Sequence, residues 1–180
     1  LFDKQLKELE KVINNHIKSD AKIAELVANI LEIKGIGILT LATILAETNG
    51  FELFNNYKQL VSYAGYDVVE AQSGTRVGKT KISKKGNSRI RRAMHMPSLV
   101  VIKCEVKPFK ELFERTYNKH GIKMKSYVAV QKKLLTMIYY MWKKKERFEP
   151  NYIKSIQEKE QKSFSLFAFE KGIKNSPNKI

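Results

Sequence analysis

The sequence is short of acidic residues, and above all of aspartate. Asp and Glu total 18 against 34 Lys and Arg, which gives a net charge of +16 over 180 residues. The three aspartates, Asp3, Asp20 and Asp67, are far apart. A metal-dependent nuclease needs several carboxylates that converge on a hard cation. We therefore find no acidic motif of that kind and expect neither a metal site nor a cofactor in this chain.

Cysteine and histidine are also scarce. Cys104 is the only cysteine, so an intrachain disulfide and a paired-thiolate zinc site are excluded. The sequence contains no signal peptide and no uninterrupted apolar segment that would span a membrane. We expect a cytoplasmic protein with no membrane partner. Because the chain starts with Leu1, in the middle of an apolar pattern, we also expect it to be part of a longer protein.

Positive charge is what the sequence has in excess. Hydrophobic residues make up 43% of the chain, which is enough for a core, so folding does not require the extra cations. Basic surfaces favour polyanions, because each neutralised phosphate releases condensed counterions. An anionic membrane or an acidic protein is the rival partner, and a generally basic proteome explains part of the excess but not its clustering. We predict a nucleic acid, and DNA before RNA.

Apolar periodicity predicts an all-α fold of several helices. Residues 1–20 repeat apolar side chains at alternating spacings of four and three, the seam of a coiled-coil-like helix that we expect to form a homo-oligomer. The seam residues are Phe2, Leu6, Leu9, Ile13 and Ile17. Further helices are expected over 21–33, 38–47, 57–63, 87–103, 108–119 and 123–145.

Three other segments carry expectations of their own. Residues 66–86 lack a helical period and contain three glycines, so a loop with room for a short extended stretch is expected. Pro97 should kink or break the helix over 87–103. Residues 154–180 are polar with one aromatic patch and are interpreted as a weakly ordered tail.

Residues 31–47 are a candidate DNA-contacting motif. Gly35 and Gly37 allow a sharp turn between two apolar helices and leave amide groups free at the start of the second. Such amides and the helix dipole suit a phosphate. The segment is similar to a helix-hairpin-helix, which grips DNA backbone without reading sequence. An ordinary tight helical corner explains this segment equally well.

The run from Ala71 to Cys104 is basic and contains no acid. A merely solvated surface would mix both signs, whereas a basic stretch rich in Gly, Ser and Thr suits a loop along phosphates. Its alternative is a flexible basic loop. The basic residues are Arg76, Lys79, Lys81, Lys84, Lys85, Arg89, Arg91, Arg92 and Lys103.

Hydroxyl groups lie within the same run, and a serine can attack a phosphodiester when a base or cations stabilise the alkoxide. Composition cannot select one serine, and Ser73-Gly74 alone is more typical of a turn. His95, Tyr140 and Trp142 are interpreted as packing residues, with base stacking as the alternative for the aromatic pair. Lys143 to Lys145 suit a helix C-terminus and are a further candidate contact to nucleic acid.

A series of short motifs follows in a fixed order along the chain. These motifs are Ile33-Lys34-Gly35-Ile36-Gly37, Phe54, Lys58-Gln59-Leu60, Tyr63-Ala64-Gly65, Ser73-Gly74-Thr75, Lys79, Ile82-Ser83-Lys84-Lys85-Gly86-Asn87, Arg89, Arg91 and Arg92. Taken together, they resemble the C-terminal transposase domain of the bridge-RNA-guided insertion-sequence recombinases. The resemblance covers about residues 25–150 and ends with Phe148-Glu149-Pro150.

The resemblance implies a role for specific residues. In that family a serine attacks the DNA strand and forms a phosphoserine link, which implies Ser73 as the nucleophile and Ser83 as the second candidate. The DNA-binding residues that we infer are Gly35, Gly37, Thr75, Arg76, Lys79, Lys81, Lys84, Lys85, Arg89 and Arg92. The family also has an N-terminal RuvC-like domain with four acidic metal ligands.

That RuvC-like domain is missing from this sequence, so the Mg²⁺ is expected in the missing domain and the chain is expected to be inactive without it. The resemblance implies 1–24 as the end of a coiled-coil segment, 25–153 as the transposase domain and 154–180 as the tail. The interpretation is a DNA transposase fragment for insertion-sequence transposition, binding element ends and target, with a guide RNA as a further candidate partner. The alternative is a non-catalytic helix-hairpin-helix module that binds DNA or RNA.

Overall fold

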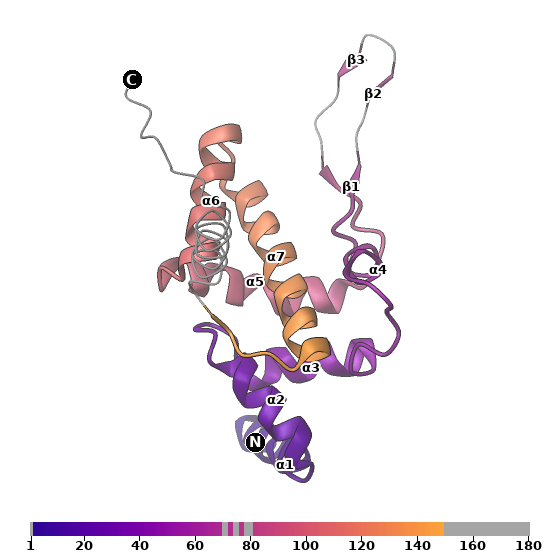
Figure 1. The fold of residues 1–180 in the computed structure, drawn as a ribbon, viewed down its shortest axis with the longest axis vertical. Helices are drawn as coiled ribbons and strands as arrows, with labels where there is room; N and C mark the ends of the chain where they lie inside the picture. Colours follow the sequence, from indigo (N-terminus) through magenta and orange to yellow (C-terminus); the bar gives the residue numbers. More distant parts are fainter. Residues whose placement is uncertain (1, 70–71, 74–75, 78–80, 150–180) are drawn as a thin grey trace, which may run out of the picture. The chain divides into compact units, whose positions relative to one another are not determined.

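The computed structural model describes residues 2–69, 72–73, 76–77 and 81–149, with backbone alone for residues 72–73 and 76–77. Residues 1–148 form one unit of the chain and residues 149–180 a second one, of which the described part is Glu149. The described residues are mostly helical, as the sequence predicts (Figure 1). The helices are α1 (Phe2–Lys18), α2 (Ala21–Leu31), α3 (Ile38–Thr48), α4 (Tyr57–Tyr63), α5 (Ser88–Lys103), α6 (Lys107–His120) and α7 (Lys123–Lys144).

Polar caps set the starts of several helices. The Asp20 carboxylate accepts hydrogen bonds from the amides of Lys22 and Ile23 and so begins α2, as expected for an N-cap. Asn87 does the same for α5 through the amides of Arg89 and Ile90. The short α4 begins where the Asn56 side chain accepts the amide of Gln59. Local sequence therefore accounts for where these helices begin.

The long helix α7 organises the core, and it packs against α2, α4, α5 and α6. Its inner face buries Leu134, Leu135 and Ile138 completely. Phe51, in the turn after α3, packs edge-on against Tyr139 of α7 at a ring-centroid distance of 5.6 Å. Burial of these aliphatic and aromatic side chains is the main source of stability, at roughly 25 cal/mol per Å² of apolar surface.

Pro97 does not break its helix, so this part of the expectation that it kinks or breaks the helix is wrong. Helix α5 continues from Ser88 to Lys103 with Pro97 inside it. Pro97 and Ser98 are both buried, and the Ser98 hydroxyl donates to the carbonyl of His95 at 2.6 Å. The packing of α5 on α7 and α3 therefore compensates for the loss of the helical hydrogen bond that proline cannot make.

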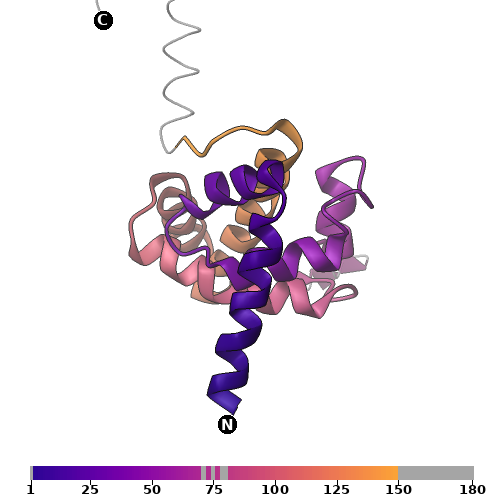
Figure 2. The ribbon, with the colours of Figure 1, turned by 90° about the horizontal axis from the view of Figure 1, so that it is seen from below.

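Helix α1 packs differently from the rest, because none of its described residues is buried. Figure 2 shows the helix running away from the other helices of its unit. Four apolar side chains on it are well exposed, and only Ile17, near its C-terminal end, packs against the core. The exposed residues are Phe2 (77%), Leu6 (59%), Leu9 (59%) and Val12 (62%).

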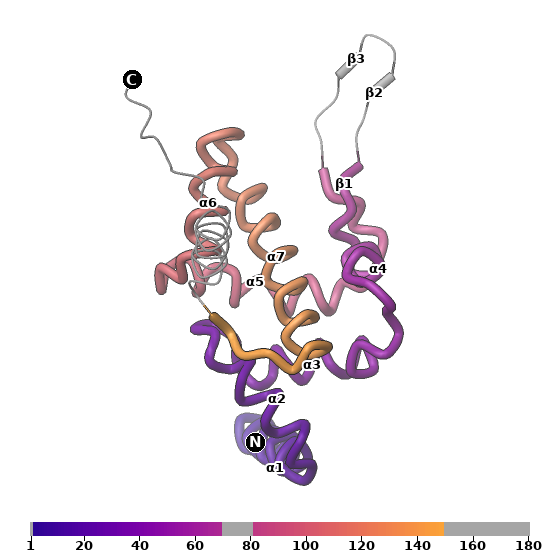
Figure 3. The backbone as a smooth tube through the Cα atoms, in the orientation of Figure 1, coloured from indigo at the N-terminus to yellow at the C-terminus, as the bar shows by residue number. Residues whose placement is uncertain are grey.

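The segment expected to be a loop contains two short antiparallel strand pairs. β1 (Val68–Val69) pairs with β4 (Lys81–Ile82), and β2 (Gln72–Ser73) pairs with β3 (Arg76–Val77). Figure 3 traces the chain from α4 out along β1 and back along β4 into α5. The expected extended stretch is therefore present, as the two arms of a hairpin.

Polar side chains connect Tyr66, which precedes β1, through Gln131 of α7 to the half-buried His95 of α5. The Tyr66 hydroxyl donates to Gln131 Oε1 of α7 at 3.0 Å, and Gln131 Nε2 lies 3.4 Å from His95 Nδ1 of α5. Burial raises the pKa of Tyr66 well above its usual value of 10.0, so the phenol remains a donor. In the part of the chain that the structure describes, no helix is long and apolar enough to cross a bilayer.

Candidate nucleic-acid interface

The two glycines of the turn between α2 and α3 have different environments. Gly35 has φ +102°, and a Cβ on it would lie 2.9 Å from Cβ of Val100 in α5. Its role is a close approach between the turn and α5, as in the ordinary tight corner that was the alternative for this segment. Gly37 is the exposed N-cap of α3, with φ −95° and open space where a Cβ would lie.

Gly37 leaves the start of α3 accessible. No described side chain caps this helix, so the amides of its first turn are available to solvent or to an anion. Ile33 and Ile36 are buried and fix the turn to the core. A phosphate at this end would meet amide donors and the positive end of the helix dipole. Gly37 thus keeps the features of a phosphate-binding turn, whereas Gly35 acts through packing.

The basic segment is built as a hairpin whose lower part, residues 67–69 and 81–85, we call the basic stem. Val68 pairs with Ile82 and Val69 with Lys81 across β1 and β4. The amide of Ser83 then donates to the carbonyl of Asp67 at 2.7 Å, and the amide of Lys84 donates to the carbonyl of Gly65 at 3.1 Å. Lys81, Lys84 and Lys85 are exposed. The stem therefore holds three ammonium groups on a hydrogen-bonded backbone.

Two glycines let the chain cross itself at the foot of the stem. Gly65 has φ +73° and Gly86 has φ +151°, both outside the range that L side chains usually adopt. A Cβ on Gly86 would lie 2.4 Å from the carbonyl oxygen of Tyr63 and 2.8 Å from the amide nitrogen of Gly65. The amide of Asn87 donates to the Tyr63 carbonyl at 2.7 Å. The end of α4 and the start of α5 are thus joined at the foot of the stem.

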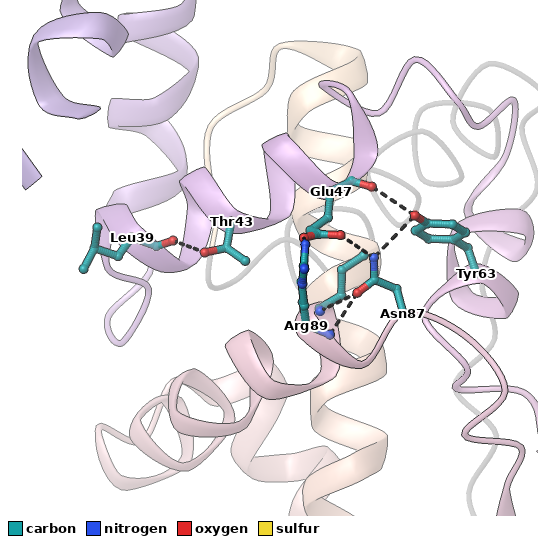
Figure 4. Close-up of polar contacts among 7 residues, drawn as sticks. Leu39, Thr43, Glu47, Tyr63, Asn87 and Arg89 are labelled. Atoms are coloured by element: carbon teal, nitrogen blue, oxygen red, sulfur yellow. Dashed lines mark hydrogen bonds and ion pairs between the residues drawn. The ribbon is translucent and has the colours of Figure 1, made fainter. Parts of the chain in front are cut away.

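A second set of contacts, the glutamate cluster of Glu47, Tyr63, Asn87 and Arg89, ties the stem to α3. Asn87 Nδ2 donates to Glu47 Oε2 at 2.7 Å, and Arg89 Nη1 lies 2.9 Å from Glu47 Oε1. The Tyr63 hydroxyl donates to the Glu47 carbonyl and accepts from Asn87 Nδ2, both at 3.3 Å (Figure 4). One carboxylate at the end of α3 therefore positions the first turn of α5.

The charges of this cluster are mutually stabilised. Hydrogen bonds from Arg89 and Asn87 lower the pKa of Glu47 below its usual value of 4.5, and the same contact with Glu47 raises the pKa of Arg89. The Glu47 side chain is 19% exposed, whereas that of Arg89 is 76% exposed. Arg89 can therefore keep one nitrogen on Glu47 and present the rest of its guanidinium to solvent or to a phosphate.

The structure brings together some of the residues that the sequence singled out. Lys81, Lys84 and Lys85 are exposed on the stem, Arg92 is exposed on α5, and Arg89 pairs with Glu47. For Ser73 and Arg76 the structure describes the backbone, in which Ser73 is paired with Arg76 across β2 and β3. Thr75 and Lys79 lie outside the described residues.

Ser83, the second candidate for the nucleophile, has a structural role. Its hydroxyl donates to the carbonyl of Gly65 and accepts from the amide of Lys85, both at 3.3 Å. Arg91 is also engaged, because its guanidinium donates to the carbonyl of Ala64 at 2.8 Å. These contacts close the foot of the stem and leave the outer basic residues to face a ligand.

Sequence reasoning missed the part of Glu47 and Tyr63 in this site. Glu47 is 40 residues before Asn87 and 42 before Arg89, and no local pattern predicts such a pairing. The one available signal was a carboxylate at the end of the apolar helix, upstream of an acid-free basic run. Among the described residues, no three of His, Cys, Asp and Glu come together as they would around a metal ion.

The chain is similar to known proteins over this site. Residues 27–114, which contain the turn, the stem and the glutamate cluster, match the family described as "Transposase IS116/IS110/IS902 family". The chain is 30% identical over 118 residues to the pilin gene-inverting proteins of Moraxella bovis and Moraxella lacunata. The alignment covers 65% of this chain and 37% of each relative, so the chain spans little more than a third of their length.

Proposed function

Residues 27–114 are a transposase domain of the IS116/IS110/IS902 family, and from this premise we propose that the chain is the DNA-binding part of a DNA recombinase. The family match carries the proposal, because it covers every element of the interface. The two relatives are named for inverting a pilin gene, which is a rearrangement of DNA. We extend that activity to the protein of which this chain forms a part.

The geometry supports attachment to the DNA backbone rather than to bases. Lys81, Lys84 and Lys85 extend from a hydrogen-bonded stem, and amides without a side-chain cap begin α3. Contacts of both kinds recognise phosphates without reading sequence. The net charge of +16 adds a long-range attraction for the same polyanion. Insertion-sequence ends and target DNA are the substrates that we propose.

The test compares duplex DNA binding by the chain and by a Lys84→Ala/Lys85→Ala variant across a salt series. If both lysines contact phosphates, the plot of log affinity against log salt becomes less steep by about 1.8, since each phosphate contributes about 0.9. The matched control, Lys119→Ala/Lys123→Ala, removes two exposed lysines at the α6–α7 turn. Equal losses in both double variants would show that binding is diffuse and would contradict the stem as the interface.

We further propose Ser73 as the group that attacks the DNA strand. Its oxygen forms a bond to phosphorus while the bond from phosphorus to one deoxyribose oxygen breaks. The serine proton ends on that leaving oxygen, so the products are a phosphoserine ester and a deoxyribose hydroxyl. The ammonium groups of the stem would stabilise the extra negative charge of the transition state. The pairing of Ser73 with Arg76 places the two backbones side by side.

We propose that magnesium is bound by another part of the recombinase and not by this chain. Among the described residues, no three His, Cys, Asp or Glu side chains lie close enough together to hold a metal ion, so these residues do not fit a magnesium centre. We therefore propose that the acidic ligands belong to an N-terminal metal-binding domain. On this proposal the chain binds DNA by itself but joins or cleaves it only with that domain.

Two further partners belong to the proposal. The exposed apolar side chains of α1 support a homo-oligomer, because Phe2, Leu6 and Leu9 lie at coiled-coil spacing. A guide RNA is the second partner that we propose for the whole recombinase. Tighter binding of structured RNA than of duplex DNA at matched salt would instead favour a non-catalytic RNA-binding module.

A further inference from the structure

Helices α4 and α7 present aromatic side chains at the surface where the core ends. Phe51 and Tyr139 are buried, whereas Tyr140, the next residue of α7, is 40% exposed. Its ring lies 5.8 Å from that of Tyr57, the first residue of α4, at an interplanar angle of 43°. Tyr57 is itself packed against the core. Core packing therefore fixes one side of this pair and leaves the Tyr140 ring accessible.

One lysine lies beside this ring, and two more are close to the tyrosine pair in sequence. Lys144 Nζ lies 5.8 Å from the centroid of Tyr140, one helical turn further along α7. Lys143 is also one turn from Tyr140, and Lys58 follows Tyr57, and all three lysines are exposed. Neither α4 nor α7 contains an Asp or a Glu, so no carboxylate on these helices offsets the charge. We call the two tyrosines and these three lysines the aromatic platform.

The platform continues from the foot of the basic stem. Helix α4 begins at Tyr57 in the platform and ends at Tyr63, whose carbonyl accepts the amide of Asn87. Seven residues of helix span about 10 Å. A nucleic-acid strand that leaves the stem would thus reach the Tyr140 ring within a few nucleotides.

An exposed ring among cations is the arrangement that binds single strands. Every base has a flat face that can stack on tyrosine, but the bases of a duplex are already stacked on one another. Ammonium groups beside the ring neutralise the flanking phosphates. We propose that the aromatic platform is a binding site for a single-stranded segment of nucleic acid, which stacks one base on Tyr140 and places its phosphates at Lys58, Lys143 and Lys144. This inference rests on nucleic-acid binding by the chain but not on attachment to the stem.

The test measures binding of the whole chain to single-stranded DNA, single-stranded RNA and duplex DNA by fluorescence anisotropy, with oligonucleotides of about 12 nucleotides. Tyr140→Leu should raise the Kd for a single strand about tenfold, because one stacked base is lost. Tyr140→Phe keeps the ring and should bind as the unaltered chain does. Duplex affinity should change little in either variant. The DNA and RNA arms identify which strand the platform prefers.

Two further measurements keep the result independent of folding. A 2-aminopurine base in the single strand should lose fluorescence on the unaltered chain, since stacking on tyrosine quenches it. Lys144→Ala should make the salt dependence of single-strand binding less steep by about 0.7, as for one lost phosphate contact. Lys22→Ala, which removes an exposed lysine of α2, should leave that slope unchanged.

Several outcomes would overturn the platform. Single-strand affinity of Tyr140→Leu within about twofold of the unaltered chain would show that no base stacks there. An equal loss in Tyr140→Phe, or a parallel loss of duplex affinity, would also contradict stacking of a single strand. In contrast, a Lys84→Ala/Lys85→Ala variant that loses duplex binding and keeps single-strand binding would support a platform that binds independently of the stem.

Discussion

The side-chain amide of Asn87 donates a hydrogen bond of 2.7 Å to the carboxylate of Glu47, across 40 residues of sequence. Asn87 also caps α5 through its side-chain oxygen, so one side chain both begins a helix and joins it to α3. The turn that suits a phosphate and the stem that carries the lysines are in this way held by one framework, whose parts can be altered one at a time.

Replacing Glu47 tests whether this carboxylate restrains Arg89. Glu47→Gln keeps a hydrogen-bonding side chain but removes the ion pair, so the whole guanidinium of Arg89, rather than part of it, becomes available to DNA. We expect the Kd for duplex DNA to fall about two- to fivefold and the salt dependence to steepen by about 0.9. A Glu105→Gln variant, which removes the ion pair to Lys110 on another part of the surface, is the control. Unchanged affinity in Glu47→Gln would show that the ion pair does not restrain Arg89.

The stability of the unaltered chain and that of Glu47→Gln should depend differently on pH. The pKa of Glu47 is lower in the folded chain than its usual value of 4.5, because Arg89 and Asn87 donate to the charged form. Its contribution to stability is therefore complete above about pH 4.5 and is lost as the pH falls through the lower, folded pKa. The difference in melting temperature between the unaltered chain and Glu47→Gln should shrink below that pH. A constant difference down to about pH 3 would contradict this.

Gly35→Ala tests the close approach of the turn to α5. Alanine at φ +102° is strained, and its Cβ would lie 2.9 Å from Cβ of Val100. We expect a loss of about 2–4 kcal/mol in the free energy of unfolding. Gly37→Ala, with ordinary φ and open space, should cost about 1 kcal/mol or less as a poorer N-cap. Urea denaturation of both variants measures the contrast, and equal losses would refute it.

Tyr66→Phe tests the polar chain in the core. The variant leaves Gln131 Oε1 buried without the phenol donor, which should lower the free energy of unfolding by about 1–3 kcal/mol. Adding Gln131→Leu should restore part of that loss, since the unsatisfied acceptor disappears. Because the pKa of Tyr66 is raised, its share of stability is complete below about pH 10 and declines above it. Tyr66→Phe should lack this decline in alkaline unfolding experiments.

Ser73→Ala tests the nucleophile, in the recombinase that includes the metal-binding domain, with cognate DNA and magnesium. The unaltered protein should give a protein–DNA adduct that survives denaturation, and peptide mapping should find it on Ser73. Ser73→Ala should abolish the adduct while duplex affinity stays within about twofold, since one neutral hydroxyl adds little to backbone binding. Ser83→Ala is the matched control. An adduct that persists in Ser73→Ala would assign the attack to another group.

Helix α1 predicts association between copies of the chain. Leu6 and Leu9 are each 59% exposed and share the apolar face. Leu6→Lys/Leu9→Lys should therefore shift the chain to a monomer in sedimentation equilibrium, and the core should remain folded because neither residue belongs to it. Lys4→Ala/Lys7→Ala, on the same helix, should leave association unchanged. A monomeric unaltered chain at high concentration would contradict this role of α1.

Local sequence determined much of this protein. Periodicity located each helix, Asp20 and Asn87 set two helix starts, and the acid-free run identified the basic segment. These features depend on neighbours within a few residues, so one sequence is enough to infer them. The hairpin within that run was only hinted at, because its two-residue strands have no room for an alternating pattern.

Only the tertiary structure decided which residues meet. Helix α5 remains continuous at Pro97, and Gly35 permits the close approach of the turn to α5. Glu47 contacts both Asn87 and Arg89. These outcomes depend on contacts between helices that are distant in sequence, where burial and geometry outweigh local preference. The sequence by itself thus determined the elements and the charge of the interface, whereas the packing of α3, α4 and α5 decided which side chains hold the stem and which remain free to contact nucleic acid.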